Sequence, residues 1–175
     1  MPFTPFHMGV GLVAKAGGDS RISLISFGLA QIAMDIEPGI GMLNSAAVLH
    51  GWTHTVAGAL AIAAALTVVA PWVVRVVVAR WNVEVSHYGL AWLTVDPPCR
   101  WSAVAAGAFF GTLSHVLLDT LIHADMAPFG PLFVRNPMLG WVEHDTVYGT
   151  CTFGILAGSL LWLLRKWFRR QSTKG

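Results

Sequence analysis

Long apolar runs separated by short polar segments make up most of the chain, and they predict its helices. Residues 56–78 form one such run, and residues 146–164 form another without a charged side chain. A third run, residues 101–122, is similar in length but contains His115 and Asp119. Because about 20 apolar residues in a helix cross the hydrocarbon core of a bilayer, each run predicts a membrane-spanning helix.

Two shorter apolar stretches, residues 7–16 and 22–34, precede these runs. The first ends at Gly17, and the second ends at Asp35, just before a turn expected at Pro38 and Gly39. Neither stretch is long enough to cross about 30 Å of hydrocarbon comfortably. We therefore expect them to be tilted, or to be packed as partial spans inside the bundle.

The polar segments between the runs are expected to be loops. Residues 82–98 are mixed in character, which predicts a surface loop or a short amphipathic piece, and the Pro- and Gly-rich residues 127–140 predict a loop before the last helix. No repeat or low-complexity segment divides the chain. The expected fold class is therefore all-α, with one domain over residues 1–175 built as a polytopic integral membrane helix bundle of four or five membrane segments.

The composition agrees with a membrane protein. Hydrophobic residues make up 55% and charged residues 11% of the chain, and the mean hydropathy is +0.61, which is too apolar for an ordinary soluble domain. The net charge is only +2, and five of the eleven Lys and Arg residues follow Trp162. Such a tail is typical of a cytoplasmic anchor, so we expect no nucleic-acid partner.

The basic residues also predict an orientation. In the expected threading, one end of the bundle collects nearly all of them and the other end collects only Arg135. Basic segments favour the cytoplasmic side, so the opposite end, where His and acidic residues gather, is expected to face the non-cytoplasmic side. Cys99 and Cys151 form no CxxC pair and would lie at different depths, so we expect no disulfide.

Three possible metal donors share one face of the third long run. His115, Asp119 and His123 are spaced i, i+4, i+8, which aligns them over two helical turns. A charged group near hydrocarbon costs roughly 2.5–3.5 kcal/mol on insertion scales, so it persists where a partner or a metal compensates. A stripe facing interfacial water would explain His123 and Asp125, but His115 lies at least one turn deeper. The spacing therefore favours a metal site.

Other segments bring further candidates to the same end of the bundle. His50 and His54 are also four residues apart, although such a pair at a helix start can instead cap the helix. Asp35 and Glu37 follow an apolar stretch, and either can solvate a turn. The full set of expected metal ligands is His7, Asp35, His54, His115, Asp119, His123, Asp125 and His144, and the expected catalytic groups are Glu37, His50 and Glu143.

A mixed set of imidazole and carboxylate donors suits Zn²⁺ best and can also hold Mn²⁺ or Fe²⁺. Without thiolates, a purely structural zinc site is not expected. The donors exceed what one four-coordinate ion needs, which suggests two ions with a carboxylate such as Asp119 between them. Such ions activate water and stabilise the attacking and leaving oxygens of a displacement, and Glu37 or Glu143 would transfer the proton.

Four motifs occur in an order that is typical of one family. The strings FHMG at 6–9, MDIEP at 34–38, GWTHT at 51–55 and SHVLLD at 114–119 resemble the bacterial inner-membrane metal-dependent hydrolase family whose named member is regulated by the LexA repressor. The agreement covers residues 6 to about 133. The resemblance implies a place in the bacterial inner membrane, and a more distant likeness to zinc-dependent phospholipases C implies phosphoester chemistry. It implies as metal ligands His7, Asp35, His54, His115 and Asp119.

The chain also departs from the family pattern. Where the family often has His-Arg-Gly before its Thr-His, this chain has Leu49-His50-Gly51, so His50 replaces an Arg that would hold a phosphate, or the substrate differs. The family's Pro-Asp-Ile-Asp-His corresponds to residues 34–38, where a His is lost. Position 123 is commonly not His in the family, so His123 and Asp125 are expected to be added ligands.

These features predict a membrane-bound metal-dependent hydrolase that acts on a phosphoester of a membrane lipid or a lipid-linked substrate. A metal or proton transporter is one alternative, because intramembrane His and Asp residues also mark ion pathways. The apolar residues 61–70 and 103–110 disfavour a polar path through the other half of the bundle. A non-catalytic membrane adaptor is another alternative, and it would tolerate the loss of Asp119.

Overall fold

Five α-helices form most of this computed structural model, which describes residues 4–95 and 100–172. They are α1 (Thr4–Gly18), α2 (Leu24–Leu43), α3 (Val56–His87), α4 (Trp101–Ile122) and α5 (His144–Ser172), and the short 3-10 turns between them are η1 (Asp19–Arg21), η2 (Trp52–His54) and η3 (Ala91–Leu93). These residues include no strand, so the all-α class is confirmed for the described part of the chain. Cys99 lies outside the described residues, and Cys151 is buried and forms no disulfide.

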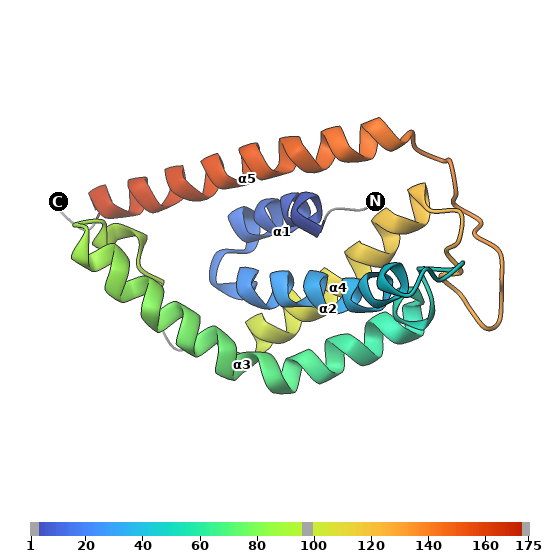
Figure 1. Cartoon of the computed structure of the whole chain (residues 1–175). Helices are drawn as coiled ribbons and strands as arrows, with labels where there is room; N and C mark the ends of the chain where they lie inside the picture. The colour runs from blue at the N-terminus through green and yellow to red at the C-terminus, as the bar shows by residue number, and fades with distance from the viewer. Residues whose placement is uncertain (1–3, 96–99, 173–175) are drawn as a thin grey trace.

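The long helices α3 and α5 run along opposite sides of the molecule in Figure 1, with α1 and α2 between them and α4 beside α2. Three helices, α3, α4 and α5, are long and apolar enough to cross a membrane. The expected four or five spans are not confirmed, because α1 has only 15 residues and polar residues, among them Gln31 and Asp35, interrupt the apolar sequence of α2. The bounds of α4 agree with the predicted run 101–122.

The turn expected at Pro38 and Gly39 is wrong, because α2 continues through both residues to Leu43. A proline inside a helix leaves the carbonyl four residues earlier without its usual N–H donor. Here that carbonyl belongs to Met34, and the Thr53 hydroxyl oxygen lies 3.4 Å from it. The side chain of Thr53 thus packs over the position of the missing amide, and α2 carries Asp35 and Glu37 on one continuous helix.

The surface loop expected at residues 82–98 is also partly wrong, because α3 continues to His87. The segment that follows folds back on this helical extension. Trp81 Nε1 donates to the carbonyl of Leu93 at 3.1 Å, and the Asn82 side chain exchanges two 2.8 Å hydrogen bonds with the backbone of Val95. These bonds satisfy the loop backbone and stabilise the last turns of α3, while residues 96–98 of the expected loop lie outside the described part.

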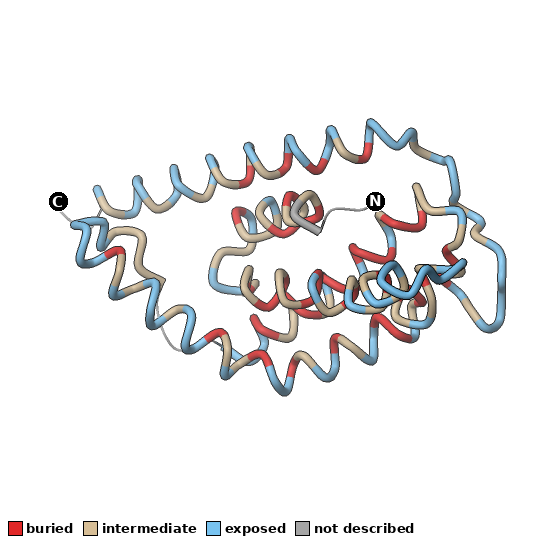
Figure 2. The backbone as a smooth tube through the Cα atoms, in the orientation of Figure 1, coloured by how far each residue is buried: buried red, intermediate tan, exposed pale blue. Residues whose placement is uncertain are grey.

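Glycines let the central helix α4 pack closely against α2. A Cβ on Gly107 would overlap the backbone of Ser23, and a Cβ on Gly111 would lie 2.7 Å from that of Ala30. Hydrogen bonds join the same helices, since Ser26 Oγ donates to the carbonyl of Val104 at 2.8 Å. Small residues four apart with polar bonds beside them are typical of close helix packing in membranes. Figure 2 shows many of the buried positions where α2 and α4 meet.

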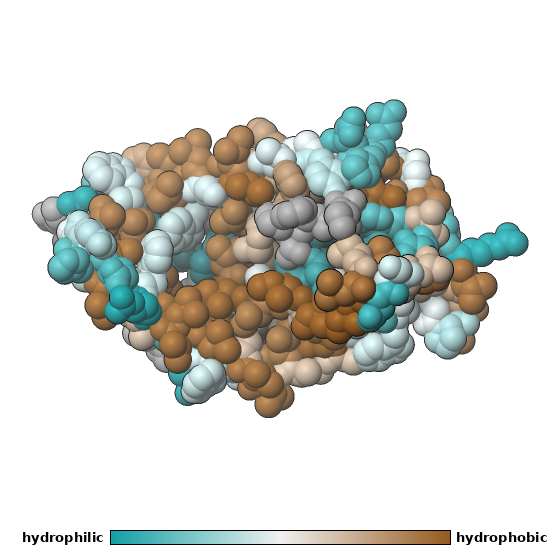
Figure 3. Space-filling model, viewed as in Figure 1, coloured by the Kyte–Doolittle hydropathy of each residue, from teal (hydrophilic) through white to brown (hydrophobic). Residues whose placement is uncertain are grey.

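Basic residues gather at the end of the molecule where α1 and α5 finish. Arg165 donates to the carbonyl of Ala16, Arg169 pairs with Asp19, and Lys166 donates to the carbonyl of Thr94 at 2.6 Å. In Figure 3, hydrophobic side chains cover much of the middle of the visible face, and hydrophilic ones gather toward its left end and its right side. This distribution suits a protein that crosses a membrane along its long axis.

Candidate metal centre

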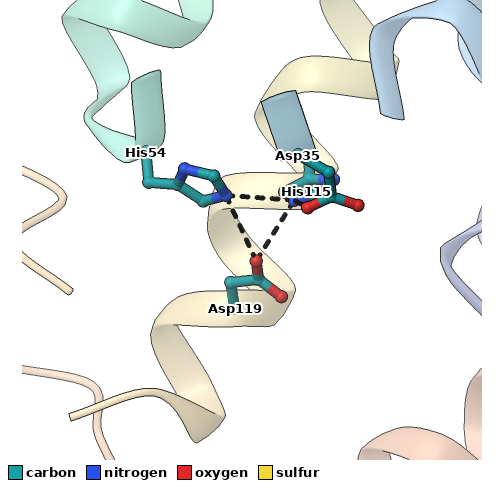
Figure 4. Close-up of side chains that lie close together, drawn as sticks. All are labelled: Asp35, His54, His115 and Asp119. Carbon is teal, nitrogen blue, oxygen red and sulfur yellow. Dashed lines mark hydrogen bonds and ion pairs between the residues drawn. The ribbon is translucent and has the colours of Figure 1, made fainter. Parts of the chain in front are cut away.

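Three segments that are distant in sequence place four side chains around one point. Asp35 comes from α2, His54 from the end of η2, and His115 and Asp119 from α4 (Figure 4). The side chains of His54, His115 and Asp119 are fully buried, whereas that of Asp35 is 20% exposed. The cluster is therefore closed on most sides and reaches solvent on the side of Asp35.

The distances between these donors fit the coordination shell of a small divalent ion. His115 Nε2 lies 3.2 Å from His54 Nε2, 3.1 Å from Asp119 Oδ2 and 3.3 Å from Asp35 Oδ1, and His54 Nε2 lies 3.5 Å from Asp119 Oδ2. Four ligands held at about 2.1 Å in a tetrahedron lie about 3.4 Å from one another. Four of the six donor pairs have the spacing that Zn²⁺ or a similar ion requires, and all four donors lie within 4.8 Å of one another.

Gln31 fixes the orientation of the His115 ring. The Gln31 side-chain amide donates to the carbonyl of Gly111 at 2.9 Å, which turns its oxygen toward His115 Nδ1 at 2.8 Å. An amide oxygen only accepts, so His115 Nδ1 carries the hydrogen of this bond. The lone pair of the neutral ring is then on Nε2, the atom that faces the cluster. A hydrogen bond to the other ring nitrogen is the usual support of a metal-binding histidine.

Thr53 and Glu37 support His54 in the same way. The Thr53 hydroxyl contacts both the carboxylate of Glu37 and, at 3.0 Å, Nδ1 of His54. Because the hydroxyl has one hydrogen and the carboxylate takes it, the oxygen accepts from His54 Nδ1. Burial lowers the pKa of His54, which favours the neutral ring with its Nε2 lone pair toward the cluster.

His7 and His123 lie on the other side of Asp119. His7 Nε2 is 3.4 Å and His123 Nε2 is 4.0 Å from Asp119 Oδ1. His123 follows directly after α4, where the Asn136 amide donates to the carbonyls of Thr120 and His123 at 2.7 and 2.9 Å. The loop at residues 127–140 therefore holds the end of α4 and, with it, the position of His123.

His50 and Asp125 form a pair beside this second group. His50 Nδ1 lies 2.8 Å from Asp125 Oδ1, and the amides of Leu49 and His50 donate to Asp125 Oδ2 at 3.0 and 3.2 Å. Burial raises the pKa of Asp125, but these hydrogen bonds outweigh it and lower the value to about 2. Asp125 is therefore a carboxylate, and its oxygens are occupied by residues 49 and 50.

Three of the expected site residues lie apart from the cluster. The Glu37 carboxylate accepts hydrogen bonds from the amides of Trp52 and Thr53 and from the Thr53 hydroxyl, so it stabilises the η2 turn. Glu143 and His144 are exposed at the start of α5, and among the described residues neither pairs with a cluster member. The structure thus brings together His7, Asp35, His50, His54, His115, Asp119, His123 and Asp125.

Sequence analysis missed the supporting roles of Gln31 and Thr53. The role of Gln31 could have been predicted, because a polar amide inside an apolar stretch needs a partner. Gln31 also lies four residues before Asp35, on the same helix face. Thr53 had no such signal, since a threonine beside a helix start is ordinarily read as a cap. Its contact with Glu37 depends on a loop that the sequence pattern does not specify.

Comparisons of the chain with protein-family models, with curated proteins and with solved structures found no match. Membership of a family is therefore not shown, and the resemblance carried by the four sequence motifs stays a prediction.

Proposed function

We propose that the protein is a membrane-bound metal-dependent hydrolase that cleaves a phosphoester of a lipid or lipid-linked substrate at the non-cytoplasmic interface. The observation that carries this proposal is the convergence of two imidazole nitrogens and two carboxylates within 4.8 Å of one another, close to a membrane-spanning helix end. One proton on His115 would satisfy only part of these contacts, whereas a divalent ion would contact all four donors.

The residues of this cluster fit a catalytic metal better than a structural one. Asp35, His54, His115 and Asp119 would hold the ion, and Zn²⁺ is the best match to their type and spacing, with Mn²⁺ or Fe²⁺ as other candidates. When bound, such an ion lowers the pKa of water and stabilises charge on phosphoryl oxygens. Asp35 Oδ1 faces the cluster and is buried, while the side chain as a whole is 20% exposed, so we expect substrate to approach past Asp35, where the cluster is least covered.

An apolar groove supports a lipid as the substrate. It lies between α1, α4 and α5, has a volume of about 360 Å³, and is lined by Gly9, Val10, Val13, Ala14, Phe110, Thr150 and Gly154. Val10 lies one helical turn beyond His7 on α1. An acyl chain in this groove would therefore leave the polar headgroup near the cluster, and the lipid would not have to leave the bilayer.

The charge distribution supports this orientation in the membrane. The basic residues at the ends of α1 and α5 favour the cytoplasmic side, whereas the cluster residues come from α2, from the turn before α3 and from the second half of α4. The resemblance to the LexA-regulated membrane hydrolase family supports the bacterial inner membrane as the location.

The test is metal analysis of purified protein in detergent together with a hydrolysis screen of phospholipids and polyprenyl phosphates. Wild type is expected to retain metal and to release a phosphorylated product. Asp119→Asn is expected to lose activity by more than about a hundredfold, since loss of a ligand exceeds the 10–100-fold effect typical of an orienting partner.

His87→Ala is the matched control, because this exposed histidine lies at the far end of α3 and should change neither property. Folded wild-type protein that holds no metal after dialysis against Zn²⁺ or Mn²⁺ would overturn the proposal. Metal uptake into sealed vesicles without hydrolysis would instead favour a transporter.

A further inference from the structure

We infer that the protein holds a second divalent ion, bound between Asp119 Oδ1 and the Nε2 atoms of His7, His123 and His50, with Asp125 as the residue that positions His50. This inference rests on the first metal site proposed above. It differs from the expectation from sequence in two respects, because His50 becomes a ligand and Asp125 does not.

The two oxygens of Asp119 face two different sets of nitrogens. Oδ2 faces His115 and His54 at 3.1 and 3.5 Å, whereas Oδ1 faces His7 and His123 at 3.4 and 4.0 Å. The side chain is fully buried, and neither oxygen has a hydrogen-bond partner among the described residues. A buried carboxylate without hydrogen bonds is costly, and one ion on each oxygen would compensate both.

His123 supplies a further lone pair on the Oδ1 side, and His50 packs directly against His123. Nε2 of each ring is buried and has no hydrogen-bond partner within the described part of the chain. The two rings stack with centroids 4.4 Å apart and planes inclined by 22°. Two adjacent imidazole rings, each with a buried and unpaired Nε2, are donors of the type that Zn²⁺ and Mn²⁺ bind.

Asp125 determines which nitrogen of His50 can bind. Its Oδ1 accepts the 2.8 Å hydrogen bond, so His50 Nδ1 carries the hydrogen. The lone pair of His50 is therefore on Nε2. The remaining oxygen of Asp125 accepts from the Leu49 and His50 amides, so three hydrogen bonds engage this carboxylate, and we assign it to fixing the ring and the chain that carries it.

The second site is more accessible than the first. The side chains of His123 and Asp125 are 16% and 31% exposed, whereas those of His54 and His115 are fully buried. We therefore expect the second ion to exchange faster. Two ions that share a carboxylate commonly lie about 3.5–4 Å apart and clamp the two oxygens of an in-line displacement, which would suit a phosphoester.

The test is to count metal ions in the full-length protein after equilibration with Zn²⁺ and removal of excess ion. Wild type is expected to hold about two ions per chain, and His123→Ala about one. Asp125→Asn is expected to keep the first ion and to bind the second about 10–100-fold more weakly, because it loses an orienting partner. His87→Ala should remain identical to wild type.

A second measurement does not depend on activity. Two Mn²⁺ ions that share the Asp119 carboxylate are magnetically coupled, so wild type should give a broadened electron paramagnetic resonance spectrum. His123→Ala should give the resolved hyperfine lines of an isolated ion. One ion in both wild type and His123→Ala, with uncoupled spectra, would overturn the second site and leave the proposed hydrolase intact. No ion in folded wild type would overturn both.

Discussion

At the scale of single residues, hydrogen bonds to the outward-facing Nδ1 atoms of the histidines orient the rings of the cluster. Each of His115, His54 and His50 has an oxygen acceptor at Nδ1, supplied by Gln31, Thr53 and Asp125. These partners hold the ring hydrogen on Nδ1 and leave Nε2 to face the cluster. A network built only for stability would not need the same tautomer at three separate histidines.

Gln31→Leu tests this support at the first site. The substitution keeps the side chain buried but removes the acceptor for His115 Nδ1, so we expect the affinity for Zn²⁺ to fall about 10–100-fold. Competition with a chelating dye in detergent measures the change. Gln31→Glu restores an acceptor and should recover most of the affinity. Equal affinities for wild type and Gln31→Leu would show that Gln31 does not orient His115.

At the scale of elements, the register between α2 and α4 decides whether Asp35 meets His115. Both helices approach at Gly107 and Gly111, and the amide of Ser23 donates to the carbonyl of Ala103 at 3.0 Å at the start of the contact. Helix α2 does not end at Asp35, so Glu37 lies on its next turn and accepts a hydrogen bond from Thr53 in the η2 turn that holds His54. The metal cluster therefore depends on helix packing some distance from it.

Gly107→Ala tests the dependence on this packing. The added methyl group would overlap the backbone of Ser23, and overpacking of this kind typically costs about 1–3 kcal/mol. We expect a lower thermal unfolding midpoint in detergent and a loss of metal affinity, because α2 must move away from α4. Wild-type stability and metal affinity in this variant would contradict the close approach.

The matched control is Gly149→Ala, at a helical glycine of α5 where a Cβ would meet no atom within 4 Å. Alanine there removes backbone freedom from the unfolded chain and should raise stability by roughly 0.5–1 kcal/mol. The expected changes in stability have opposite signs at Gly107 and Gly149. This difference distinguishes a packing effect from a general effect of replacing glycine.

At the scale of the whole molecule, apolar periodicity predicted the helices but not where all of them end. The apolar run 101–122 predicted the bounds of α4 correctly, because the sequence changes sharply from apolar to polar at both ends of the run. Helix α2 continues through Pro38, where the side chain of Thr53 packs over the Met34 carbonyl. Helix α3 continues past Arg80, where Trp81 and Asn82 form hydrogen bonds with residues 93 and 95. Neither contact can be read from the local sequence. The sequence pattern could not show which donors meet, because Asp35, His54 and His115 lie on segments that only the tertiary structure brings together.

The groove beside His7 gives the last prediction, which concerns how the whole bundle would select its substrate. Val13 lines this groove and is 47% exposed, so Val13→Trp should fill the space proposed for an acyl chain. Loss of contact with about two methylene groups at ~0.8 kcal/mol each would lower affinity for a long-chain phospholipid roughly tenfold. A short-chain, water-soluble phosphoester that does not reach the groove should be cleaved at the wild-type rate.

The ratio of kcat/KM for the two substrates is therefore the measurement that separates binding of the chain from damage to the metal cluster. Val68→Trp is the control, because Val68 is 73% exposed on α3 and is not part of the groove lining. It should leave the ratio unchanged. An equal fall for both substrates in Val13→Trp would indicate that the substitution disturbs α1 and His7. Wild-type kcat/KM for both substrates would show that the acyl chain lies elsewhere, since a tryptophan ring in the groove leaves it no room there.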